Sequence, residues 1–229
     1  MNVKRTGTEY PEPVVRYRFH TREIGEFDIH YRALRDRNQY DDDSGETEAL
    51  GIPPASWPLY GVVWQAGEVL AKLMSHYDID SRRILEVGCG VGLASLVLNK
   101  RHADITATDI HPGACLNLQY NTELNQDPDI PFLRCAWKDP RDEKTGLFDL
   151  IIASDVLFEP GHAIALAKFI ELYAKPRCEV LLTDAGRGYG NHFTREMEAR
   201  GYKQTRLETI APITNPEKYK GRIQRYRRS

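Results

Sequence analysis

Apolar positions along the chain follow two patterns, which alternate from one segment to the next. Short runs typical of buried strands occupy residues 83–87, 105–109, 131–135, 148–154 and 178–183. Segments with helical spacing occupy residues 61–76, 92–101, 112–124, 161–174 and 190–200. Because strands and helices alternate regularly, the pattern predicts an α/β fold with a mostly parallel sheet and helices on both faces.

The two ends of the chain follow a different pattern. Residues 14–34 alternate apolar and polar positions around a central glycine, which predicts a β-hairpin. The polar and acidic residues 35–51 predict a solvated surface loop. In the tail, residues 202–211 and 221–228 predict two further strands. The basic side chains of the second are typical of an edge strand, and they could also steer an acidic partner or RNA.

Size and composition narrow the class of protein. The 229 residues suit one domain with a modest extension, so we expect an N-terminal extension over 1–50 and a main domain over 51–229. A net charge of −2 gives no overall attraction to nucleic acid or membrane. The N-terminal stretch MNVKRTGTEYPEP shows no apolar core of a secretory signal, and no apolar run approaches the ~18 residues of a membrane span.

The cysteines indicate the compartment and bear on metal binding. They are widely separated and form no CxxC pair, at Cys89, Cys115, Cys135 and Cys178. This spacing argues against a zinc site and against a disulfide framework. We therefore expect no bound metal and a cytoplasmic protein with reduced thiols.

A glycine-rich turn follows the first predicted strand of the main domain, in the segment ILEVGCGVGLASL. Gly88 and Gly90 lack a Cβ, so the backbone can turn sharply and approach a ligand closely. A dinucleotide site would place its third glycine at position 93, which is Leu93; the third glycine is Gly92. The spacing GxGxG therefore favours a nucleoside without a pyrophosphate.

Two acidic residues support a nucleoside site. Asp109 ends the second strand about 20 residues after the glycines, where a carboxylate can accept hydrogen bonds from ribose hydroxyls; it could also cap the next helix. Glu86 interrupts an apolar strand and needs a hydrogen-bonding partner, either the loop backbone or a ligand ammonium group. Together these features point to S-adenosylmethionine.

EVGCGVG followed by an acidic strand end resembles the S-adenosylmethionine-dependent methyltransferases. The resemblance covers about residues 60–200 and implies a Rossmann-like seven-stranded sheet with an antiparallel C-terminal strand. The segments VVWQAGEVLAKLM, CAWKDP, LIIASDVLFEP and LLTDAGRG resemble the methyltransferase-like family 16 group. That group includes protein lysine methyltransferases and relatives labelled nicotinamide N-methyltransferases.

The resemblance also implies site residues. Trp64, Trp137 and Ser154 fall on positions that line the cofactor in that group. The expected cofactor set is completed by Glu86, Gly88, Cys89, Gly90, Gly92, Asp109 and Ile110. The group's Asp/Glu-x-x-Tyr motif here reads Asp155-Val156-Leu157-Phe158, so Phe158 keeps the aromatic wall and lacks the hydroxyl.

We expect methyl transfer from S-adenosylmethionine, leaving S-adenosylhomocysteine, to a protein lysine or an N-terminal amine. Asp155 would orient the amine, hydrogen-bond it or accept its proton through water. Arg187 could hold an acidic substrate group or form a surface salt bridge. Trp57 could belong to the core or to a lid over the cofactor.

Other functions remain open. A pyridine nitrogen such as that of nicotinamide needs no base, so a small-molecule acceptor fits the same residues. A nucleic-acid methyltransferase of the amino-methylating type would carry Asn/Asp-Pro-Pro-Tyr/Phe where this chain reads Ser-Asp-Val-Leu-Phe. A non-catalytic cofactor-binding adaptor would share the fold. We expect a monomer or a weak dimer, with no strong signal for nucleic acid and none for a membrane.

Overall fold

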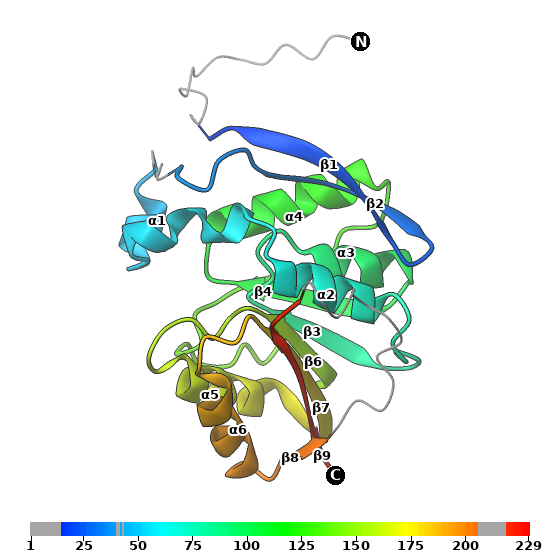
Figure 1. The fold of residues 1–229 in the computed structure, drawn as a ribbon, viewed down its shortest axis with the longest axis vertical. Coiled ribbons are helices and arrows are strands. Elements are labelled where there is room, and N and C mark those ends of the chain that lie inside the picture. The colour runs from blue at the N-terminus through cyan, green and yellow to red at the C-terminus, as the bar shows by residue number, and fades with distance from the viewer. Residues whose placement is uncertain (1–14, 40–41, 43, 206–218) are drawn as a thin grey trace.

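The computed structural model describes residues 15–39, 42, 44–205 and 219–229. A seven-stranded sheet forms the centre of the protein (Figure 1). Its strands are β3 (Arg83–Val87), β4 (Asp104–Asp109), β5 (Phe132–Arg134), β6 (Phe148–Ser154), β7 (Ala174–Asp184), β8 (Lys203–Thr205) and β9 (Arg222–Arg228). They lie in the order β5-β4-β3-β6-β7-β9-β8. The strands β3 to β7 pair in parallel, while β9 is antiparallel to both of its neighbours. The predicted mostly parallel sheet with an antiparallel C-terminal strand is confirmed.

Helices cover both faces of this sheet because its strands are apolar on both sides. They are α2 (Gln65–Met74), α3 (Leu93–Lys100), α4 (Pro112–Leu124), α5 (His162–Tyr173) and α6 (Gly190–Glu198). On β3, the fully buried Ile84 joins the core cluster that contains α2 and α3. The next residue, Leu85, joins the opposite cluster, which contains residues of α5 and α6. Successive strand residues therefore feed two separate cores, as the period of two requires.

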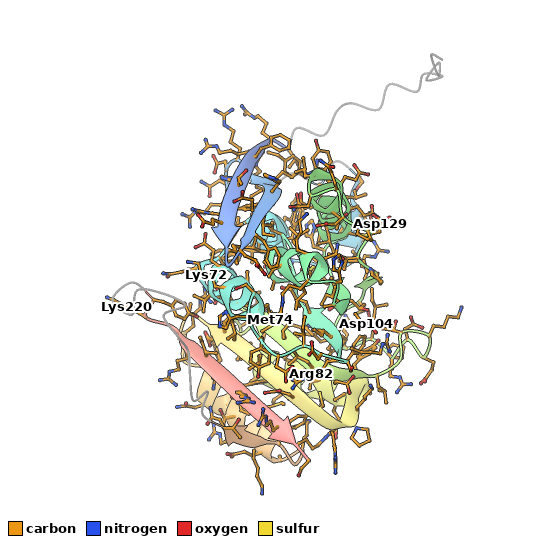
Figure 2. All side chains as sticks on the ribbon, turned by 90° about the vertical axis from the view of Figure 1, so that its right-hand side faces the viewer. Lys72, Met74, Arg82, Asp104, Asp129 and Lys220 are labelled. Atoms are coloured by element: carbon orange, nitrogen blue, oxygen red, sulfur yellow. The ribbon has the colours of Figure 1, made fainter. Side chains whose placement is uncertain are left out.

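The N-terminal hairpin is a separate two-stranded sheet of β1 (Tyr17–Ile24) and β2 (Phe27–Leu34), as predicted. It lies over the helices at the end of the molecule opposite β7 and β9, as Figures 1 and 2 show. Ile29 and Tyr31 are buried in the same core cluster as α2 and α3. The backbone amides of His30 and Arg32 donate to Asn125 and Asn121 of α4, at 3.0 and 2.8 Å. The hairpin therefore shares its core with residues of the main domain. The division of the chain into an extension over 1–50 and a domain over 51–229 stays a prediction.

Two short helices occupy the segment before α2. The α1 helix (Glu46–Ala49) lies where a loop was predicted, and the Asp42 carboxylate accepts the amides of Thr47 and Glu48 at its start. A 3₁₀ helix, η1 (Pro54–Gly61), precedes α2, so the predicted helix over 61–76 begins later, at Gln65. Pro58 inside η1 lacks the backbone N–H that an α-helix would need at that position.

The basic tail differs from its prediction as well. Strand β9 lies between β7 and β8, so it is an interior strand and not an edge strand. Arg225 and Arg227 of β9 donate to the buried carboxylate of Glu179 on β7, which explains why basic residues are accommodated there. Of the strand predicted over 202–211, residues 206–211 lie outside the described residues.

The chain reverses its direction of travel across the sheet between β3 and β6. From β3 it proceeds through β4 to β5, and from β6 it proceeds the other way to β7. Ligands of open α/β sheets bind outside the carboxyl ends of the strands at such a point. Among the described residues, no helix is long and apolar enough to cross a membrane.

Candidate active site

A cavity of about 470 Å³ opens at the carboxyl ends of β3 and β6. Residues from six separate stretches of the chain line it. The lining includes the following residues that were predicted for the site from the sequence: Trp64, Glu86, Gly88, Cys89, Gly90, Asp109, Ile110, Trp137, Ser154, Asp155 and Phe158. Of the predicted site residues, all of which the structure describes, only Gly92 does not line the cavity wall.

The glycine loop approaches its surroundings too closely for side chains. Gly88 and Gly90 have φ angles of 63° and 55°, in the left-handed region that favours glycine. A Cβ on Gly90 would lie 3.0 Å from the carbonyl oxygen of Tyr60. Gly92 begins α3, and a Cβ there would collide with Leu118 of α4. Gly92 is therefore required for packing of the loop behind the cavity.

Asp109 holds the glycine loop from the end of β4. Its Oδ2 accepts the amide of Gly90 at 2.9 Å, and its Oδ1 accepts the amide of His111 at 2.9 Å. Burial raises the pKa of the Asp109 carboxyl, and these backbone hydrogen bonds oppose that effect. The cap of α4 is His111, whose Nδ1 accepts the amide of Gly113 at 3.0 Å. Asp109 thus holds the glycine loop, whereas His111, two residues later, caps α4.

Glu86 lies beneath the same loop and is 2% exposed. Its Oε2 accepts the amide of Ser95 at 2.9 Å and also the Ser95 hydroxyl. Burial raises the pKa of Glu86 to about 7, although the hydrogen bonds from Ser95 oppose the shift. The partner is thus Ser95 in the first turn of α3, and not the loop backbone that the sequence suggested as one alternative.

Aromatic residues form much of the remaining wall. The rings of Tyr60 and His111 stack with centroids 4.0 Å apart, and burial lowers the pKa of His111 to about 4. Trp64 does not belong to α2 as expected; it precedes that helix in extended conformation, and its indole donates to Leu59 at 3.3 Å. Trp57 donates to the Ile52 carbonyl oxygen at 2.9 Å, so it supports the segment from which Ile52 reaches the cavity.

Asp155 follows β6 and enters an ion pair inside the cavity. Its φ angle of 57° is uncommon for a residue with a side chain and marks a sharp turn at the strand end. The Arg187 guanidinium, from the loop after β7, donates to both carboxylate oxygens, at 2.9 Å to Oδ2. The Ala185 amide also donates to Oδ1, at 3.3 Å. The hydrogen bond to Asp155 raises the pKa of Arg187. The pair is therefore an intramolecular salt bridge, as one of the two roles considered for Arg187 required, but it lies in the cavity wall and its partner is Asp155.

Two histidines of the wall were missed as site residues. His111 could have been suspected, since it follows Asp109 at a strand end. His162 lies at the start of α5 and lines the cavity, where its ring contacts Trp137 from the loop after β5. A single sequence carries no signal for the path of that loop.

The chain was compared with known proteins. A family model described as lysine methyltransferase matches residues 59–199. Protein N-lysine methyltransferase METTL21A of Danio rerio is 27% identical over 128 residues, which are 53% of this chain and 59% of that protein. Histone-arginine methyltransferase METTL23 of Xenopus laevis is 29% identical over 108 residues, 44% of this chain and 46% of that protein. The chain spans about half the length of the curated relatives it matches.

Solved structures share the fold at low sequence identity. The 16S rRNA methyltransferase RsmC of T. thermophilus, solved with AdoMet and guanosine, has a TM-score of 0.64 at 16% identity, over 96% of this chain and 52% of that one. A TehB-like SAM-dependent methyltransferase from Corynebacterium glutamicum has a TM-score of 0.55 at 18% identity, over 81% of this chain and 100% of that one. The family match covers more than half of the chain, and the chain belongs to the lysine methyltransferase family.

Proposed function

We propose that this protein is an S-adenosylmethionine-dependent methyltransferase. The observation that carries the proposal is that the glycine loop, Asp109 and Asp155 line the same cavity, at the point where the chain reverses across the sheet. Membership of the lysine methyltransferase family supports it. S-adenosylmethionine would supply a methyl group on a sulfonium centre, which a nucleophile can displace in one step.

The residues of the cavity suit that cofactor. The carboxyls of Glu86 and Asp109 offer acceptors for a ligand rich in hydroxyl and ammonium donors. The aromatic side chains of the wall can pack against a nucleobase and tolerate a cation. We assign cofactor binding to Trp64, Glu86, Gly88, Cys89, Gly90, Asp109, Ile110, Trp137 and Ser154, with Gly92 supporting the loop from behind.

The proposed acceptor is a protein lysine or an N-terminal amine. Relatives in the family are named as protein lysine methyltransferases, among them METTL21A of Danio rerio and EEF1A lysine methyltransferase 3 of Mus musculus. Asp155 and Phe158 lie at the cavity wall beyond the glycine loop, where they would position the amine and its apolar stem. Burial of the amine among aromatic side chains would exclude water from the reaction.

A small-molecule acceptor is the second candidate, and one observation favours it. Arg187 already neutralises Asp155, so the cavity can take an uncharged nitrogen such as that of a pyridine without a counterion. A pyridine nitrogen carries no proton to be removed at neutral pH. This candidate would use the same cofactor residues and differ only in the acceptor.

A labelling experiment separates the two candidates. Purified protein and S-adenosylmethionine with a labelled methyl group are incubated with lysate, and macromolecules are then separated from small molecules. Label in a protease-sensitive band that yields methyl-lysine or an N-methylated terminal residue on hydrolysis is the expected result. Label confined to the small-molecule fraction would instead support the pyridine-type acceptor. Gly90→Arg is the control, because a side chain there fills the space beside Tyr60.

The cellular setting is proposed on separate grounds. The four cysteines are all free thiols in the structure, which suits a reducing compartment. We therefore propose a cytoplasmic enzyme, acting as a monomer or a weak dimer on its acceptor.

A further inference from the structure

The acceptor amine raises a chemical problem that Asp155 alone does not solve. A lysine ammonium group has a pKa of about 10.4 and must lose a proton before its nitrogen can attack. The Asp155 carboxylate accepts donors from Arg187 on both oxygens and from Ala185 on one. Both carboxylate oxygens are thus occupied by donors, so a proton from the amine could reach either oxygen only by displacing a hydrogen bond of the guanidinium.

His162 lies on the same cavity wall and has the geometry of a proton acceptor. Its Nδ1 lies 3.0 Å from the carbonyl oxygen of Val156. A carbonyl oxygen only accepts hydrogen bonds, so Nδ1 must carry a hydrogen. In the neutral ring Nε2 is then the nitrogen with the free lone pair. Backbone contact thus fixes both the tautomer and the orientation of the imidazole.

The surroundings of Nε2 suit a transient positive charge. Glu159 lies 3.4 Å from Nε2 through its Oε2, and its side chain is 49% exposed, so a proton can pass on to solvent. Phe158 and Trp137 meet the His162 ring edge to face, with centroids at 4.6 and 5.2 Å, and hold it against the cavity. The His162 side chain itself is only 21% exposed.

We infer that His162, not Asp155, removes the proton from the acceptor amine; the inference rests on the proposed function. An N–H bond of the bound ammonium breaks, its electron pair stays on the amine nitrogen, and the proton forms a bond to Nε2 of His162. The imidazolium pairs with Glu159 and returns the proton to water after transfer. Asp155 and Arg187 act as positioning residues that shape the cavity.

Other ionisable groups share this part of the wall. They are Glu159 on the same loop, the Asp155–Arg187 pair, and Cys135 from the loop after β5. Burial raises the pKa of Cys135 to about 12, so its thiol stays neutral near physiological pH. Glu159 is exposed and faces Nε2 of His162, where it would pair with the imidazolium. His162 is then the remaining group of this wall that can take the proton.

The test compares His162→Gln with a matched control. His192 of α6 faces Glu196 at 3.7 Å in a similar His–Glu pair and does not line the cavity, so His192→Gln changes the same chemistry elsewhere. The acceptor is the lysate protein fraction that the wild type labels, and turnover is measured from pH 7.5 to 9.5. Cofactor affinity is measured in parallel by calorimetry.

The expected result is a turnover about 100-fold lower for His162→Gln at pH 7.5, with unchanged cofactor affinity and no effect of His192→Gln. The deficit should shrink toward pH 9.5, since about 100-fold more of the amine is then already neutral. Added imidazole should restore turnover to His162→Ala. A small deficit, or one that stays constant with pH and resists imidazole, would overturn the inference while wild-type activity leaves the proposed function intact. Absence of wild-type labelling would instead remove the proposed function.

Discussion

Glu86 shows how one buried carboxyl makes stability depend on pH. In the unfolded chain a glutamate has a pKa of about 4.3, whereas burial raises it to about 7 in the folded protein. The folded state therefore binds this proton more tightly than the unfolded state. The stability that results is fully present below about pH 4.3 and is lost as the pH rises through about 7.

Glu86→Gln should remove that dependence while keeping an oxygen to accept the Ser95 donors. Relative to the wild type, the free energy of unfolding of the variant should rise between pH 5 and pH 8, by up to about 3 kcal/mol. Urea denaturation of both proteins at several pH values measures the difference, in which contributions from groups that do not interact with Glu86 cancel. Parallel pH curves for the two proteins would show that Glu86 titrates normally.

Asp109 connects two parts of the site through its two oxygens. Asp109→Ala should leave the amides of Gly90 and His111 without their acceptor, at a cost of about 1–3 kcal/mol in unfolding free energy. Affinity for S-adenosylmethionine, measured by calorimetry, should fall at least about tenfold because the glycine loop loses its anchor. Asp104→Ala is the control: it lies at the other end of β4, labelled in Figure 2, and its ion pair with Arg83 is exposed. Equal losses in both variants would contradict the assignment.

At the scale of the elements, α4 joins the hairpin to the glycine loop. Asn121 of α4 is fully buried; its Oδ1 accepts the Arg32 amide of β2 at 2.8 Å, and its Nδ2 donates to Val91 at 3.2 Å. Asn121→Ala should therefore destabilise the protein by about 1–3 kcal/mol and expose β1 and β2 to hydrogen exchange. Glu123→Ala, an exposed substitution on the same helix, should change neither quantity. Unaltered exchange in the hairpin would mean that its apolar contacts suffice.

The elements also show what local pattern can and cannot reveal. Strand β6 and helix α4 were predicted with the observed bounds, because a buried apolar run or helical spacing is a local property. The glycine loop was recognisable because positive φ angles leave a direct trace in the sequence. Helix α1, η1 and the position of β9 depend on prolines, side-chain caps and partners far along the chain.

The site, like the fold, has residues that could be predicted from the sequence and contacts that could not. Residues at strand ends, such as Asp109 and Asp155, could be predicted to line one cavity, since parallel strands end at one edge of the sheet. The pairing of Asp155 with Arg187 joins residues 32 apart, and that of His162 with Trp137 depends on two loop paths. Such contacts follow from tertiary packing and have no local pattern.

At the scale of the whole molecule, segments from most of the sheet contribute residues to the cavity. Its wall combines segments before α2, after β3, after β4, after β5, after β6 and after β7. Each of these segments follows a strand or precedes a helix. Residues of both core clusters line the cavity, so a ligand there would contact both clusters. Binding at such a point stabilises the native chain by mass action, because the unfolded chain has no site.

S-adenosylhomocysteine at 100 times its dissociation constant should therefore stabilise the protein by about 2.7 kcal/mol. For a chain of this size that corresponds to a rise in Tm of about 5–10 °C, measurable by calorimetry. NAD at the same concentration should give no shift, because Leu93 stands where a pyrophosphate site needs its third glycine. The rise should also vanish in Gly90→Arg, provided that circular dichroism shows this variant to be folded. A shift with NAD and none with S-adenosylhomocysteine would reverse the assignment of the cavity, since an open α/β sheet can hold a nucleoside or a dinucleotide and the glycine spacing is the feature that favours the nucleoside.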